Sequence, residues 1–286
     1  VTQYSFGGES DADFQRYEAK TEINFKKPNP RSSINNSITI NSILASDLED
    51  YYNNKTTHKY FHNIEYDLVN KRKINPYNVS VNIQASKGFV KSWVETNYTI
   101  TYNNVRKGLN IRFFAGKFLY NSNTYYGNYN FRLSGTTGYQ DYTFDNIFLG
   151  RMEAITNDAD NHLLSQQFIR NDGGFTTYTL LGQTNNWLTT LNLTSSLPSK
   201  IPFKIYANIG TYYNIKDYST SNQFIYEAGI EFSVINNIFA IYAPVIMSND
   251  LKETNDFITD NYWQKIRFIF NLNKLYTLKN ASSFIN

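Results

Sequence analysis

The stretch RYEAKTEINFK, from Arg16 to Lys26, decides the fold class. Every second residue is polar or charged, and apolar residues or threonine fill the positions between them. A helix would place Glu18 over Glu22, and like charges at that spacing repel one another. An extended chain instead puts the charged and apolar sets on opposite faces. The stretch therefore predicts a β-strand with one charged face and one apolar face.

The same alternation recurs along the chain, in segments of about ten residues separated by loops rich in Asn, Asp, Ser, Gly and Pro. Besides the opening stretch, these segments cover residues 37–44, 63–69, 77–85, 94–102, 109–118, 128–133, 174–183, 187–197, 203–214, 224–234, 238–247 and 263–272. Repeated short alternating segments are typical of a transmembrane β-barrel, whose apolar side chains face lipid and whose polar side chains face the lumen. We therefore predict an all-β antiparallel transmembrane β-barrel.

The number of strands follows from the count of segments. Bacterial single-chain barrels have an even number of strands, whereas thirteen segments alternate clearly here. A hidden strand within Asp141–Arg151 would give fourteen strands, and fusion of two segments would give twelve. The short turn at Asn236 and Asn237 is expected on the periplasmic side, with the longer loops 214–222 and 246–262 outside. We predict 12 to 14 strands in a single barrel domain covering residues 1–286.

Composition separates the barrel from several other classes of protein. The 24 tyrosines and 21 phenylalanines include many near predicted strand ends, where membrane-interface girdles require aromatic rings. The 27 basic and 24 acidic residues nearly balance, which argues against a nucleic-acid partner. The absence of cysteine excludes disulfides and thiolate metal sites. A soluble sandwich or soluble barrel would show the same alternation around a packed core, and it stays open as the alternative.

The hydropathy profile points to strands rather than helices as the spanning elements. Mean hydropathy is −0.49, and the longest apolar run, Ile238–Met247, is about half of the roughly 20 residues that a spanning helix needs. No basic and apolar leader begins at Val1, so we expect any signal peptide to have been removed. We therefore expect the outer membrane of a Gram-negative bacterium, with outer-membrane lipid against the apolar faces.

The charged faces of the predicted strands supply the candidates for residues that line the lumen. These candidates are Arg16, Glu18, Lys20, Glu22, Glu95, Arg112, Glu227, Glu231, Lys265 and Arg267. A selective channel normally presents an excess of one sign of charge. Because both signs are present, the set favours a cross-braced, closed interior over a selective pore.

One long segment interrupts the regular succession of strands. Residues 136–175 are too many for a periplasmic turn and alternate weakly, and segments of this length are usually functional or disordered. Residues 153–169 are expected to form a short helix or a loop inside the lumen. We expect residues 136–175 to be an insertion in the lumen or on the periplasmic side, to pair their acids with Arg112 and Arg267, and to block conductance.

Three stretches carry a resemblance to a known family. They are Gly108–Arg151, RNDGGF around Asp172, and LTSSLPSKIPFKIYANIG ending at Gly210. With them, residues 14–272 resemble the C-terminal barrel region attached to M1-type (gluzincin) metallopeptidase-like proteins of Bacteroidota. The resemblance implies an outer-membrane location and a periplasmic peptidase-like domain upstream. The chain contains no HExxH motif, so no zinc-site residue is carried over.

The sequence offers few residues for catalysis or metal binding. His58 and His62 would face the same side of a helix, but on a strand they lie roughly 13 Å apart, too far to share an ion. His162 stands among acids that lack the glycine and distal glutamate of a calcium loop. No nucleophile elbow occurs. We predict no catalytic residue, no metal and no cofactor.

Three functions remain after these exclusions. The first is a non-enzymatic outer-membrane barrel that anchors or docks a periplasmic or surface partner domain, peptidase-like by resemblance. The second is a channel or transporter for small solutes. The third is a soluble secreted β protein that binds carbohydrate through its many tyrosines.

Overall fold

The computed structural model describes most of the chain. The described residues are 2–4, 14–25, 27, 29, 31–50, 55–104, 107–122, 129–151, 163–197, 202–215, 223–234, 238–259 and 261–271. Two earlier candidates, His162 and the turn at Asn236 and Asn237, lie outside them.

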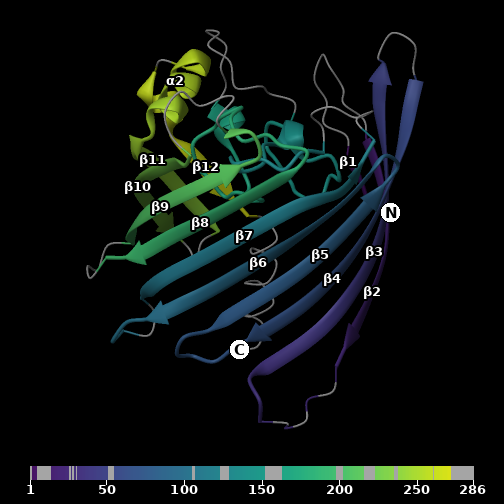
Figure 1. Ribbon diagram of the computed structural model, residues 1–286, viewed down its shortest axis with the longest axis horizontal. Coiled ribbons are helices and arrows are strands. Elements are labelled where there is room, and N and C mark those ends of the chain that lie inside the picture. Colours follow the sequence, from purple (N-terminus) through teal and green to yellow (C-terminus); the bar gives the residue numbers. More distant parts are fainter. Residues whose placement is uncertain are drawn as a thin grey trace, which may run out of the picture.

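In the described residues, twelve strands form one antiparallel sheet in which each strand pairs with its neighbours in the sequence (Figure 1). They are β1 Thr2–Tyr4, β2 Phe14–Asn24, β3 Ile34–Asp50, β4 Lys55–Asn70, β5 Tyr77–Ser86, β6 Phe89–Thr101, β7 Gly108–Asn121, β8 Trp187–Ser196, β9 Phe203–Tyr212, β10 Ile225–Val234, β11 Phe239–Met247 and β12 Arg267–Phe270. This is the strand order of an up-and-down barrel, and it confirms the predicted fold class. The twelve described strands agree with the predicted range of 12 to 14. Among the described residues, β1 and β12 are the sheet edges and do not pair with each other.

The two faces of the sheet follow the alternation of the sequence. On β7, Arg112 and Phe114 are buried on the concave face, whereas Phe113 and Leu119 are exposed on the convex face. Aliphatic side chains are exposed on the convex face from β2 to β11, including Ile23, Ile40, Ile64, Ile83, Ile205, Ile230 and Val245. The separation of charged and apolar faces that RYEAKTEINFK predicts is therefore present across the sheet.

The connections differ in length at the two ends of the sheet. β10 ends at Val234 and β11 begins at Phe239, whereas β7 ends at Asn121 and β8 begins at Trp187. The β7–β8 and β11–β12 connections lie at the same end because the strands alternate in direction. We call this end the long-loop end.

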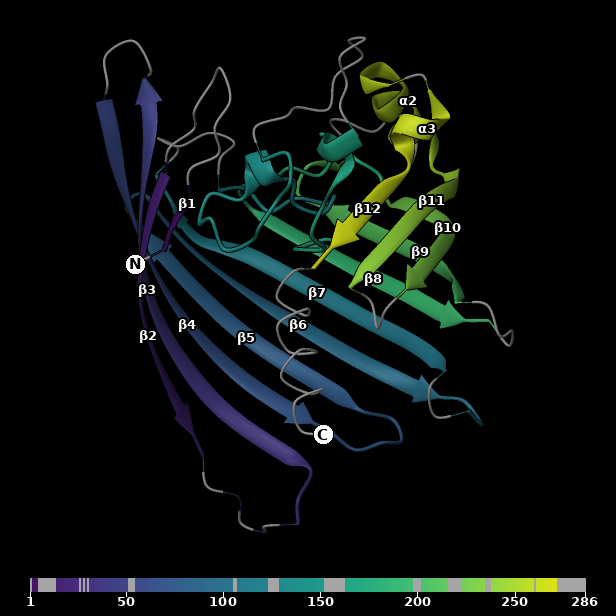
Figure 2. The same ribbon diagram turned by 180° about the vertical axis from the view of Figure 1, so that it is seen from behind.

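Residues 129–151 and 163–186, which we call the inner segment, lie against the concave face of the sheet (Figure 2). Two stretches predicted as strands, 128–133 and 174–183, belong to it and form only isolated bridges, Phe131–Thr184 and Ser134–Phe175. Residues 141–151 contain no strand, so the predicted hidden strand is wrong. Of the expected helix, the described part is one 3-10 turn, Leu163–Gln166.

The apolar alternation of the inner segment has a different cause from that of the strands. Phe131, Leu133 and Phe175 are fully buried because they pack against Phe114 and Leu188 of the concave face. The edge-to-face ring pair of Phe114 and Phe131 has a centroid distance of 5.7 Å. The main hydrophobic core therefore lies inside the curve of the sheet, between the wall and the inner segment.

The β11–β12 connection contains two short helices, α2 Asn249–Ile258 and α3 Tyr262–Lys265. The strand predicted to begin at Trp263 begins only at Arg267, because Asn261 caps α3 by accepting a hydrogen bond from the Trp263 amide at 3.0 Å. Within the described residues, no helix combines the length and the apolar character needed to cross a membrane.

Candidate functional site: the inner segment and the wall that holds it

A row of polar side chains crosses the concave face from β6 to β10. Arg112 donates to Glu95 at 2.7 Å and to Asn192 at 2.8 Å, and Asn192 donates to Asn208 at 2.9 Å. Asn208 in turn donates to Glu227 at 2.6 Å. The register places Arg112, Asn192, Asn208 and Glu227 directly opposite one another on successive strands. These residues form one continuous hydrogen-bonded row, which we call the polar row.

Residues 172–177 of the inner segment rest on the polar row. The Gly173 carbonyl accepts a hydrogen bond from Asn192 at 3.0 Å. Gly174 has φ +70, and a Cβ atom there would lie 2.7 Å from a guanidinium nitrogen of Arg112 and 2.9 Å from the Asn192 side-chain oxygen. Only glycine combines this backbone conformation with so close an approach. The GG pair therefore lets the backbone lie directly on the wall.

Glu227 binds the next two residues of the inner segment. Its carboxylate accepts from the Thr176 amide at 2.6 Å, the Thr176 hydroxyl at 3.0 Å and the Thr177 amide at 3.0 Å. Together with Asn208, these donors surround a side chain that is 1 % exposed. A buried carboxylate is stable only when donors of this kind satisfy it.

Arg267 of β12 also binds the inner segment, including Thr176, which Glu227 contacts as well. It is fully buried and donates to the Ser134 hydroxyl at 3.2 Å, the Thr176 carbonyl at 3.2 Å and the Gln167 carbonyl at 3.4 Å. Its guanidinium lies 4.4 Å from the ring centre of Phe168. These contacts join three separate parts of the inner segment to β12.

Lys91 of β6 makes a third attachment, within an aromatic cage. Its ammonium donates to the Tyr129 carbonyl at 3.1 Å. Five ring centres lie between 5.0 and 5.8 Å from the ammonium, and they belong to Phe89, Trp93, Phe118, Phe131 and Tyr142. Tyr142 also donates to Gln84 of β5 at 2.6 Å.

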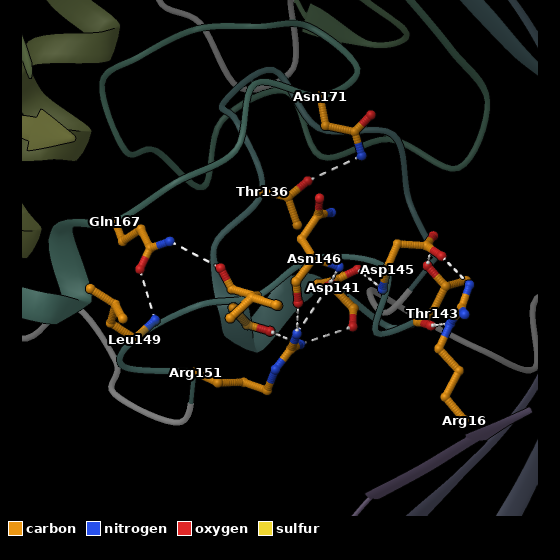
Figure 3. Close-up of polar contacts among 12 residues, drawn as sticks. Arg16, Thr136, Asp141, Thr143, Asp145, Asn146, Leu149, Arg151, Gln167 and Asn171 are labelled. Atoms are coloured by element: carbon orange, nitrogen blue, oxygen red, sulfur yellow. Dashed lines mark hydrogen bonds and ion pairs between the residues drawn. The ribbon is translucent and has the colours of Figure 1, made fainter. Parts of the chain in front are cut away.

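The inner segment reaches β2 through Arg16 (Figure 3). Arg16 donates to the Thr143 carbonyl at 2.9 Å and forms ion pairs of 2.6 Å with Asp145 and with its strand neighbour Glu18. The Asp145 side chain is 46 % exposed, so this attachment is wetter than those at Glu227 and Arg267. The inner segment is thus joined to strands near both edges of the sheet, from β2 to β12.

A second hydrogen-bond cluster gives the inner segment its own shape (Figure 3). Arg151 forms an ion pair with Asp141 at 3.1 Å and donates to the carbonyls of Gly138 and Asn146. Its guanidinium also lies 5.1 Å from the ring centre of Phe144. A buried arginine that satisfies several carbonyls replaces the backbone ladder that this turn-rich stretch lacks.

Part of the concave face is not covered by the inner segment. On β2, Lys20 and Glu22 are exposed, and on β4, Glu65 and Asp67 are half-buried. The described residues contain no salt bridge to Glu65 or Asp67. The uncovered wall therefore carries more negative than positive charge.

Nine of the ten charged residues chosen from the sequence lie on strands with their side chains toward the concave face. Lys265 does not, because it lies in α3 and forms an ion pair with Asp256 of α2. The acids expected to pair with Arg112 and Arg267 include residues 153, 158 and 160, which lie outside the described residues. The described acids of the inner segment form no salt bridge with either arginine. Glu95 is the acid that pairs with Arg112, and Arg267 is bound mainly by carbonyls.

Several residues of the site are not among the candidates that the sequence supplies. Lys91 and Lys204 lie on the polar faces of their strands, and Lys204 forms an ion pair with Glu231 at 2.7 Å. The alternation of polar and apolar residues along β6 and β9 would have been enough to predict that both lysines face the lumen. Asp145 and Arg151 belong to the irregular inner segment, where no periodic signal exists. Their partners could be found only from the tertiary structure.

The histidines and acids form no candidate metal centre in the described part of the chain. His58 and His62 lie on β4, and their ring nitrogens make hydrogen bonds with Ser46 at 2.7 Å and Ser42 at 3.0 Å. Within the inner segment, burial raises the pKa of Asp172, and the positive charge of Lys91 opposes the increase. Burial also raises the pKa of Tyr142 well above its ordinary value.

Solved structures include chains with a similar fold. No family model and no curated protein matches the sequence. The structure of BamA from Haemophilus ducreyi lacking POTRA domains 1–3 matches with 10 % identity and a TM-score of 0.44. The match covers 87 % of this chain and 55 % of that chain.

Proposed function

We propose that this chain is an outer-membrane β-barrel whose lumen is closed by the inner segment, and that it anchors or docks a periplasmic or surface partner domain. The observation that carries the proposal is the set of attachments between the inner segment and the wall, from Arg16 on β2 to Arg267 on β12. A segment bound at so many points, several of them fully buried, stays in place and blocks the passage.

The convex face supports the membrane location. Its exposed aliphatic residues are neighbours across strands, as in the run Ile40, Ile64 and Ile83 on β3, β4 and β5. A contiguous apolar face of this kind is unfavourable in water and suits the hydrocarbon of a bilayer. The soluble carbohydrate-binding alternative would need another layer of protein over this face.

The docking role is supported by apolar side chains at the long-loop end. Tyr139 and Leu163 of the inner segment are each 70 % exposed, and Trp263 of α3 is 74 % exposed. Gln166, close to Leu163, donates to the Trp263 carbonyl at 2.7 Å, so the two elements form one surface. A partner domain would cover these side chains. The peptidase-like identity of that partner rests on the sequence resemblance alone.

A gated channel is the second candidate, because part of the concave face stays uncovered. Glu65 and Asp67 on that part would attract cations into any passage beside the inner segment. If the protein is a channel, we expect cation selectivity. If it is an anchor, we expect no steady conductance.

Planar-bilayer recording of the purified protein distinguishes the two functions. The anchor reading expects little conductance from the intact protein and large openings after residues 123–186 are replaced by a short turn. Stable, cation-selective channels in the intact protein would instead establish the transport function. A protein that is soluble and monodisperse without detergent would refute both.

A further inference from the structure

The convex face carries one feature that a simple apolar belt does not need. A groove with a volume of about 310 Å³ crosses β5 to β8. Its lining combines small and larger side chains and includes Val81, Ser92, Val94, Ala115, Trp187 and Thr189. Its volume is at the lower end of the range of ligand pockets, roughly 300–1,000 Å³.

A single cation stands at one end of this groove. Lys117 of β7 is exposed on the convex face, directly opposite Ser92 on β6 and Trp187 on β8. The described residues contain no salt bridge to Lys117. Lys117 is thus flanked on the convex face by the positions of a hydroxyl and an indole, and no described carboxylate forms an ion pair with it.

The polar end of the groove lies toward the long-loop end of the sheet, and the apolar end lies toward the middle of the convex face. Lys117 lies toward the long-loop end of β7, where Tyr120 is exposed. Tyr213, which follows β9 and whose amide donates a hydrogen bond to the Trp187 carbonyl, is also exposed. Two residues further from that end, Ala115 lies between Val94 and Thr189, and Phe113 follows it along the strand. The groove thus runs from an aromatic and charged rim toward the apolar middle of the face.

We infer that this groove binds one phosphate-bearing lipid of the membrane, with its phosphate at Lys117 and Ser92 and an acyl chain along Ala115 and Thr189. The phosphate accepts charge-assisted hydrogen bonds from the ammonium and a hydrogen bond from the hydroxyl. The small side chains of Ala115 and Thr189 leave room for the chain, and Trp187 also lines the groove. The inference rests on the membrane location in the proposed function.

Native mass spectrometry of the detergent-purified, delipidated protein tests the inference. The probe is phosphatidylglycerol, and diacylglycerol with the same acyl chains is the comparison that lacks phosphate. Lys117→Gln should weaken phosphatidylglycerol binding about fivefold, the effect of one lysine near an anionic surface, and should leave diacylglycerol binding unchanged. Ala115→Leu should weaken the binding of both lipids because it fills the groove.

Two matched variants control for charge and for size. Lys73→Gln removes an exposed lysine from the β4–β5 connection at the other end of the sheet. Ala207→Leu enlarges a half-buried alanine of the convex face on β9. Both should bind lipid as the parent protein does. Equal phosphatidylglycerol binding by the parent and Lys117→Gln, or equal losses in Lys117→Gln and Lys73→Gln, would overturn the inference.

The experiment also separates this inference from the proposed function. A protein that needs detergent but fails the Lys117 comparison keeps its membrane location and loses only the lipid site. A protein that stays soluble without detergent removes the basis for both.

Discussion

The carboxylate of Glu227 should control how firmly the inner segment is held. In Glu227→Gln, an NH2 group replaces one carboxylate oxygen and cannot accept a hydrogen bond. Depending on the rotamer, it faces either the Thr177 amide or the donors of Thr176 and Asn208. At least one buried donor then loses its acceptor, which costs about 1–3 kcal/mol. Because the variant also removes the negative charge near buried Arg267, we expect a total of roughly 3 kcal/mol, or about a hundredfold in the open population of this stretch.

Hydrogen exchange measured by mass spectrometry on the intact protein reads this change directly. Peptides covering residues 173–179 should exchange about a hundredfold faster in Glu227→Gln, because the amides of Thr176 and Thr177 donate to Glu227. Glu18→Gln is the matched control, since Glu18 pairs with Arg16 at an exposed position and such pairs contribute about 0–1 kcal/mol. Unchanged exchange in Glu227→Gln, or equal acceleration in both variants, would refute the role of Glu227.

Three further predictions concern the inner segment and the convex face. Gly174→Ala should accelerate exchange across residues 172–177, because its Cβ would meet Arg112 and Asn192; Ala228→Gly, away from this contact, should not. Asp172→Asn should slow exchange of the inner segment at pH 7 and flatten its dependence on pH. Because burial raises the folded pKa of Asp172, its stabilising contribution is present below the ordinary carboxyl pKa and is lost as pH rises through the raised value. Ile111→Lys, on the convex face, should lower the unfolding free energy in detergent or lipid by about 2–4 kcal/mol if it lies near the membrane midplane; a cost below about 0.5 kcal/mol would contradict a lipid-facing position.

The main difference between expectation and structure lies in the stretches 128–133 and 174–183. Both alternate as strands do, and the structure places both in the inner segment. Alternation reports that one side of an extended chain is buried, but it does not report what buries it. Phe131 and Phe175 face the wall of the sheet, and the same pattern would arise if they faced lipid.

The sequence by itself determined the antiparallel sheet, the strands β2 to β12, and the concave position of charges such as Arg112 and Glu227. These properties follow from the alternation of polar and apolar residues with a period of two, which can be recognised within each segment by itself. The sequence did not predict β1, and Lys117 of β7 lies on the convex face instead. Only the tertiary structure decided that the inner segment covers part of the concave face, that Glu227 binds Thr176 and that Arg267 binds Ser134. Glu227 and Thr176 are 51 residues apart, and Arg267 and Ser134 are 133 apart. Contacts at such separations depend on how the whole sheet curves, and no periodicity in the sequence encodes them.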